Sequence, residues 1–337
     1  MKPTPLLTYC ETIHTRGSHQ SFLSEEEPFL FTVVLCAACG TMADEEGVWN
    51  VKNSFFLGCY QQAISEAFGA HKVSAAGRSL CNFYMYRAYI EQGQHRMVLD
   101  EVRPDAPLAI QAVKLLATYA SSGREGKDMA LMQLKEWLSS PGAAAEPQLL
   151  LIAGLVFSHE GDYKEALKYT HSSTDLETMS LVAHIYLLMN RVDLARKQVG
   201  LMQQSDDDAT LTKLAAAWVA MAEGGDKYNE AYLEFDELAE KYNLSLMLSN
   251  GKALAKLHMG QYEEAERLLQ EALSKSASDA TTLSNMVVCM QHLRKPPDVI
   301  VRYVNQLRAV SPTHPWVMKY GELDSSFDRC ANQISSM

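Results

Sequence analysis

Hydrophobic positions along the chain form two kinds of apolar segment that recur in a regular order. The spacing is clearest in residues 225–275, where Tyr228 and Ala231 are followed by Tyr262 and Ala265 after 34 residues. Each period contains an apolar stretch with helical spacing, a short turn that carries glycine, and a second helical stretch. A repeat of this length predicts stacked helical hairpins, each burying its apolar face against its neighbours.

Small or β-branched residues mark the second helix of each predicted hairpin. The markers are Ala63, Val98, Ala130, Ala166, Ala195, Ala231, Ala265 and Val299. They predict about eight hairpins over residues 42–313. Gly260 precedes its marker by five residues and is expected to end a first helix with a positive φ angle. Asn190 and Arg294 occupy this place in two weaker repeats. The period and the alanine marker resemble the tetratricopeptide repeat (TPR), so the expected fold is all-α, a right-handed TPR-like α-solenoid.

The two ends of the chain depart from this repeat. Residues 1–41 are predicted to be an unfolded or misannotated extension before a native start at Met42. Its apolar run, Phe29 to Cys39, is too short to cross a membrane and follows acidic residues. Residues 314–337 are predicted to form a C-terminal capping helix and tail, with Trp316 and Phe327 as apolar anchors, because terminal repeats need a cover.

Charge and cysteine content narrow the possible partners and location. The chain has 30 Lys and Arg against 41 Asp and Glu, a formal net charge of −11, and no cluster of basic residues. A surface that follows phosphates is therefore not expected, so nucleic acid is excluded and direct binding to anionic lipid is disfavoured. The seven cysteines are scattered and odd in number, which favours a reducing compartment, the cytosol.

No catalytic motif emerges, so the chain is not expected to be an enzyme or to need a cofactor or metal. Zinc-protease and serine-hydrolase motifs are absent from the sequence. His184, near the end of a first helix, is expected to be a solvated or capping group. The remaining enzyme hypothesis is a reactive thiolate, which would require Cys59, Cys81 or Cys289 to be exposed beside a cation.

What remains is the inner surface of the solenoid. Two positions on each first helix, 15 and 11 residues before the marker, are expected to line a concave groove. The candidate partner-binding residues from this set are Phe83, Arg87, Leu115, Tyr119, Leu151, Leu155, Asn250 and Leu254. Because most are apolar, they favour a permanent partner segment within the superhelix. The alternative is that a tightly wound solenoid partly fills its own groove.

Several stretches also resemble one family, the epsilon subunits of coatomer. They include NVKNSFFLGCYQQAI at 50–64, DDDATLTKLAAAWV at 206–219 and QHLRKPP at 291–297. The similarity runs colinearly from about 50 to 329, whereas residues 1–41 match nothing in the family. Arg294 stands where glycine is expected before Lys-Pro-Pro, and residues 121–147 are only loosely similar.

The resemblance implies a non-catalytic structural subunit of the COPI vesicle coat, acting in Golgi-to-ER retrograde and intra-Golgi transport. It implies binding to the C-terminal region of the coatomer alpha subunit and contact with other coatomer subunits. It also implies a cytoplasmic location, with peripheral association to Golgi membranes and COPI vesicles through an Arf-family GTPase. The alternative function is a general TPR adaptor that binds chaperones or peptide C-termini. Such an adaptor would need several Lys, Arg and Asn residues together in the groove, and only Lys52, Arg87 and Asn250 qualify, far apart in the repeat register.

Overall fold

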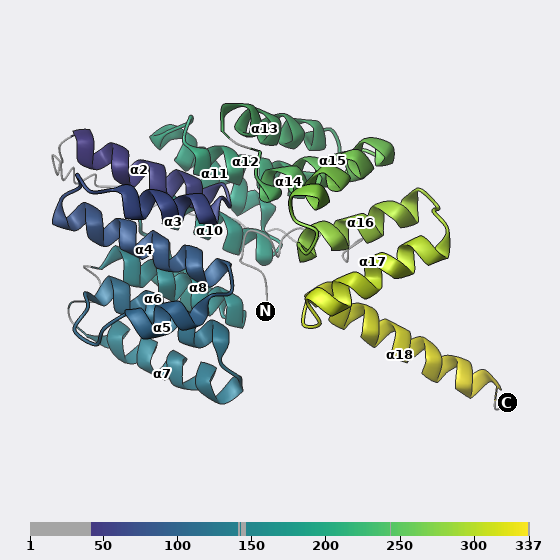
Figure 1. Ribbon diagram of the computed structural model, residues 1–337, viewed down its shortest axis with the longest axis horizontal. Helices are drawn as coiled ribbons and strands as arrows, with labels where there is room; N and C mark the ends of the chain where they lie inside the picture. Colours follow the sequence, from purple (N-terminus) through teal and green to yellow (C-terminus); the bar gives the residue numbers. More distant parts are fainter. Residues whose placement is uncertain (1–41, 141, 143–145, 243, 336–337) are drawn as a thin grey trace.

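The computed structural model describes residues 42–140, 142, 146–242 and 244–335, so the predicted extension 1–41 lies outside the described part of the chain. Within these residues the chain is all helical and forms eight consecutive hairpins followed by one further helix (Figure 1). The first helices of the hairpins are α2 (Met42–Phe56), α4 (Ala75–Glu91), α6 (Leu108–Ser121), α8 (Pro147–Glu160), α10 (Leu176–Leu188), α12 (Thr210–Glu223), α14 (Leu246–His258) and α16 (Ala280–His292). The second helices are α3 (Tyr60–Gly69), α5 (His95–Glu101), α7 (Arg124–Ser139), α9 (Tyr163–Thr170), α11 (Val192–Ser205), α13 (Lys227–Lys241), α15 (Tyr262–Lys275) and α17 (Pro297–Val310), and the last helix is α18 (Pro315–Ser335).

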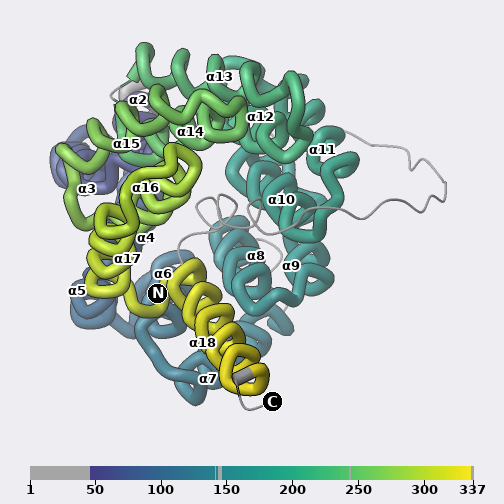
Figure 2. The backbone as a smooth tube through the Cα atoms, turned by 90° about the vertical axis from the view of Figure 1, so that its right-hand side faces the viewer, coloured from purple at the N-terminus to yellow at the C-terminus, as the bar shows by residue number. Residues whose placement is uncertain are grey.

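The first helices form the inner layer of the solenoid and the second helices the outer layer (Figure 2). Nine of the thirteen residues of α10 are buried, because neighbouring helices cover it on several sides. In contrast, only Ala265, Leu269 and Ala272 are buried among the fourteen residues of α15. This single apolar stripe is the pattern of a surface helix. The predicted register is confirmed, since Ala265 is fully buried.

The turn between the two helices of a hairpin has the same geometry in strong and weak repeats. Gly260 has φ = 76°, as predicted, and the next amide, that of Gln261, donates to the carbonyl of Lys256 over 2.9 Å. Arg294 has φ = 52°, and the amide of Lys295 likewise donates to the carbonyl of Met290 over 3.0 Å. Both turns therefore close the first helix with the same left-handed C-terminal motif.

Replacing Arg294 with glycine is expected to stabilise the protein by about 1 kcal/mol, since a left-handed conformation costs a residue with a Cβ atom roughly 1–2 kcal/mol. Its exposed side chain has little packing to lose. Asn190→Gly is the matched control, because Asn190 has φ = 60° and asparagine tolerates this region better. Urea denaturation measures both changes. A loss of stability in Arg294→Gly would contradict the prediction.

The superhelix completes a full turn, so that its first hairpin packs against later ones. Helix α2 contacts α12, and the Thr210 hydroxyl donates to the side-chain carbonyl of Asn53 over 2.6 Å. The Trp49 and Tyr242 rings lie 6.4 Å apart between centroids. In Figure 2, α2 and α3 accordingly lie behind α13 to α15. Contacts across the superhelical turn thus enclose its centre.

The last helix differs from the predicted cap in how it packs. Trp316 is partly buried and stacks on Tyr320 with 5.1 Å between ring centroids. Arg308 of α17 lies over the Tyr320 ring, so the first turns of α18 contact the solenoid. Phe327, however, is 72% exposed. Its predicted role as an anchor is wrong, because α18 continues away from the last hairpin instead of folding back onto it (Figure 1).

Candidate partner-binding site

The turns of the superhelix enclose a central cavity of about 1120 Å³, lined by the inner helices and the start of α18. The hairpins from α2 to α10 contribute most of its aromatic and large aliphatic side chains, Phe55, Phe56, Leu116, Tyr119, Leu151 and Leu155 among them, interspersed with charged and polar residues. The side facing the C-terminus is largely polar, with Asp279, Thr281, Thr313, His314, Lys319 and Glu322. The predicted apolar character therefore holds for only part of the wall.

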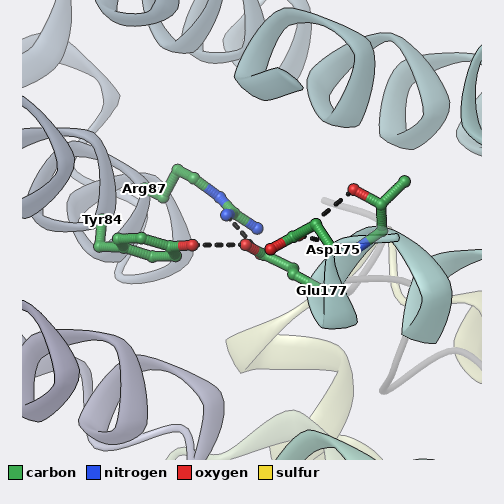
Figure 3. Close-up of polar contacts among 5 residues, drawn as sticks. Tyr84, Arg87, Asp175 and Glu177 are labelled. Atoms are coloured by element: carbon green, nitrogen blue, oxygen red, sulfur yellow. Dashed lines mark hydrogen bonds and ion pairs between the residues drawn. The ribbon is translucent and has the colours of Figure 1, made fainter. Parts of the chain in front are cut away.

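A buried ion pair crosses the cavity wall between α4 and α10. Arg87 Nη1 lies 2.6 Å from Glu177 Oε1, and the Tyr84 hydroxyl donates to Glu177 Oε2 over 2.6 Å (Figure 3). The guanidinium carbon of Arg87 also lies 4.6 Å from the centroid of the Phe55 ring. Both charged side chains are about nine-tenths buried. This cluster joins the second hairpin to the fifth, which are 90 residues apart in sequence.

The local sequence around Glu177 explains its position. Glu177 lies in the first turn of α10, where the free amide groups and the helix dipole favour a carboxylate. Asp175 caps the same helix by accepting a bond of 3.2 Å from the Thr178 amide (Figure 3). Burial, together with the charge of Glu177, raises the pKa of Tyr84 well above its ordinary value. Tyr84 thus remains a hydrogen-bond donor to Glu177.

A second polar group lies further along the wall. The Tyr119 hydroxyl donates to Glu160, and the Lys127 ammonium lies 4.8 Å from the centroid of the Tyr119 ring. Burial and the bond to Glu160 raise the pKa of Tyr119. The aromatic face of Tyr119 and the charge of Lys127 are therefore already engaged within the chain.

His184 is placed differently from its prediction as a solvated or capping group. The side chain is 4% exposed, on α10 in the cavity wall. Burial, aided by the neighbouring His159, lowers its pKa from 6.5 to about 3, so it is neutral at physiological pH. The prediction was wrong because α10 packs against α8, α9, α11 and α12, which the local sequence around His184 does not reveal.

The thiolate hypothesis fails on the three candidate cysteines. Cys81 and Cys289 are buried, and Cys59 is partly buried. Burial raises the pKa of all three thiols, to about 12 for Cys289. A raised thiol pKa disfavours the nucleophilic thiolate. In the part of the chain that the structure describes, no group of three or more His, Cys, Asp or Glu side chains could hold a metal ion.

Four of the eight predicted groove residues line the cavity, and the other four do not. Arg87, Tyr119, Leu151 and Leu155 are in its wall. Phe83, Leu115, Asn250 and Leu254 are instead buried between helices, each at most 3% exposed. The Asn250 amide, for example, donates to Thr282 Oγ1 over 2.8 Å and accepts from Asn285 over 3.1 Å. Of the predicted partner-binding residues, only the four in the cavity wall therefore remain candidates for contact with a partner.

The prediction also missed wall residues that depend on the superhelical turn. Phe55 and Phe56 reach the cavity from the end of α2, and Glu177 reaches it from the start of α10. A fixed offset from each repeat marker selects the middle of each first helix and so misses helix ends. The adjacent pair Phe55 and Phe56 could have indicated this part of the wall. Two adjacent residues point in different directions from a helix, so a single buried face cannot cover both, and a second apolar surface is needed.

These features define a class of protein: a TPR-like α-solenoid scaffold with a central cavity. A chain in the crystal structure of the APC/C hetero-tetramer Cut9-Hcn1 has a similar fold, with a TM-score of 0.53 and 13% identity. The match covers 81% of this chain and 54% of that chain. At this identity the likeness concerns the fold alone. Among the helices that the structure describes, none combines the length and apolar character needed to cross a bilayer.

Comparison with known sequences identifies the family within this class. The family model described as coatomer epsilon subunit matches residues 44–335. Coatomer subunit epsilon-1 of Oryza sativa subsp. japonica is 43% identical over 296 residues, covering 87% of this chain and all of that protein. Coatomer subunit epsilon of Dictyostelium discoideum is 31% identical, covering 82% of this chain and 95% of that protein. The chain belongs to the coatomer epsilon subunit family and is a coatomer component.

Proposed function

We propose that the protein is a non-catalytic structural subunit of the COPI coat that binds the C-terminal region of the alpha subunit through its central cavity. The observation that carries this proposal is the cavity itself, whose apolar side is formed by inner helices of several hairpins. A concave surface with apolar residues from several hairpins suits a partner segment, since burying apolar area drives stable association.

The charges in the cavity disfavour the alternative of a general adaptor for peptide C-termini. Three cations line it, Arg87, Lys127 and Lys319, together with four carboxylates. Arg87 is already paired with Glu177, and Lys127 already lies over Tyr119. A free carboxylate bound here would therefore meet net negative charge instead of the cluster of basic groups that its recognition requires.

The transport role follows from the same proposal. As a coat subunit, the protein would act in Golgi-to-ER retrograde and intra-Golgi transport from the cytoplasm. It would reach Golgi membranes and COPI vesicles through the rest of the coat and an Arf-family GTPase. Family membership supports a coat role, and the net charge of −11 argues against direct attraction to anionic lipid.

Replacing Leu155 with glutamine is expected to weaken binding to the C-terminal region of the alpha subunit at least tenfold, about 1.4 kcal/mol, because an amide would be buried without a partner. Leu155 lies in the apolar part of the wall. Leu233→Gln on the outer helix α13, where the side chain is 55% exposed, is the matched control. Calorimetric titration measures both affinities, and thermal unfolding shows whether each variant is folded.

A capture experiment from cytosol distinguishes the two functions. With the full chain as bait, the alpha subunit should be retained through a high-salt wash, because salt screens exposed charges but not an apolar interface. Retention of chaperones alone would replace the coat proposal with the adaptor. Equal affinity of Leu155→Gln and the parent chain would place the alpha subunit outside the cavity.

A further inference from the structure

Helix α18 carries an apolar stripe with the period of a coiled-coil seam, and the stripe is exposed from Leu323 onwards. Its members are separated alternately by four and three residues: Trp316, Tyr320, Leu323, Phe327, Cys330 and Ile334. This 3.5-residue period is that of core positions in paired helices. Leu323, Phe327 and Ile334 are 65%, 72% and 74% exposed, and Cys330 is also exposed.

The stripe lies beside the face of α18 that lines the cavity and is not part of that lining. Met318, Lys319 and Glu322 of the same helix line the cavity, so α18 extends the inner wall as a first helix does in each hairpin. In the eight complete hairpins, a second helix packs against the first. The stripe therefore occupies a face that a second helix covers elsewhere in the solenoid.

We propose that a second copy of this chain covers the stripe, with the two α18 helices packed in parallel. The charges beside the stripe favour this arrangement. Lys319 and Asp324 flank it on opposite sides, five residues apart. In a parallel pair this spacing places Lys319 of each copy beside Asp324 of the other. Within the described part of the chain, neither residue forms an ion pair of its own.

The same charges disfavour the antiparallel arrangement. With the stripes aligned in opposite directions, Asp324 of one copy would lie near Asp324 of the other, and like charges would repel. Lys319 would then lie opposite the uncharged end of the helix. A parallel pair also brings Cys330 beside its counterpart, whereas an antiparallel pair places it beside Tyr320. The arrangement of the two helices can therefore be read from cysteine chemistry.

The contact is short, so dimers are expected to form as the concentration of the full chain rises. Sedimentation equilibrium should show an apparent mass that increases towards twice the monomer mass. The double variant Leu323→Glu with Phe327→Glu should remain monomeric, because it buries two charges in the seam. Ser325→Glu is the matched control: it adds a charge on the face of α18 that carries Met318 and Glu322, away from the stripe, and should dimerise like the parent chain.

Charge reversal tests the parallel register. Lys319→Glu should weaken dimerisation severalfold, because it places two carboxylates side by side, and adding Asp324→Lys should restore it.

Cysteine oxidation tests the same arrangement independently. The oxidant diamide should link the two Cys330 thiols, taking up the two protons and two electrons that they lose, and Cys330→Ser should abolish this link. A chain that stays monomeric would overturn the proposal, as would a dimer that retains its affinity in the seam variant. Dimers without the Cys330 link would overturn the parallel arrangement, and loss of alpha-subunit binding in place of dimerisation would assign the stripe to the coat partner.

Discussion

Replacing Glu177 with alanine is expected to lower the free energy of unfolding by about 3–5 kcal/mol, the cost of leaving one member of a buried ion pair without its partner. Arg87 would retain its charge in a site where its side chain is 9% exposed. Tyr84 would also lose the acceptor of its 2.6 Å hydrogen bond. Because these residues join the second hairpin to the fifth, the change should also loosen the superhelical turn.

A double variant without charges separates this penalty from the net contribution of the pair. Arg87→Met combined with Glu177→Leu should be much more stable than Glu177→Ala, since apolar residues of similar volume leave no buried charge. Urea denaturation measures all three proteins. Asp193→Ala is the control, because its pair with Arg191 is more than half exposed and should contribute little. Equal losses in Glu177→Ala and Asp193→Ala would show that the buried pair is not what holds the turn.

The hairpins could be predicted from the sequence because their determinants are local. Ala265 and its counterparts need only be small enough for a neighbouring helix to approach, and Gly260 needs only a positive φ angle. Both requirements recur at a fixed period. At Arg294 the position in the repeat predicts the backbone conformation better than the residue type does. Arg294 has the positive φ angle expected of glycine, although its repeat resembles the TPR pattern poorly.

The cavity wall could be predicted only in part, because it depends on contacts across the superhelical turn. The offset from each marker correctly selected Leu151 and Leu155 on α8. It also selected Leu254, which is completely buried between neighbouring helices. The angle between successive hairpins determines which first helices meet, and small packing differences at many interfaces set that angle. No single motif in the sequence records it.

Polar residues in the wall were the hardest to place. Arg87 was predicted as a contact for a partner, yet Glu177 from a distant hairpin neutralises it. His184 follows the ordinary pattern of a helix end and is nevertheless buried. Both outcomes depend on contacts between residues far apart in sequence. Stability measurements on variants of each residue test these contacts directly.

His184 is expected to make the protein less stable as the pH falls below its ordinary pKa. Burial holds its folded pKa at about 3, against 6.5 for an unperturbed histidine. Below pH 6.5 the unfolded chain therefore binds a proton that the folded chain excludes. The stabilising contribution is complete above pH 6.5 and declines as the pH falls towards 3. At 1.36 kcal/mol for each pH unit, the loss between pH 6.5 and 4.5 is about 3 kcal/mol.

The difference in pH dependence between the parent chain and His184→Gln isolates this effect. Carboxylates also titrate in this range, but their contributions are common to both proteins and cancel in the comparison. Urea denaturation is measured in steps of about one pH unit, at about pH 7.5, 6.5, 5.5 and 4.5. Over this range the free energy of unfolding of the variant should fall by about 3 kcal/mol less than that of the parent. His171→Gln, at an exposed position on the outer layer, is the matched control and should follow the parent. Parallel curves for the parent and His184→Gln would mean that His184 accepts a proton within the fold, and would require water to enter the cavity wall beside α10.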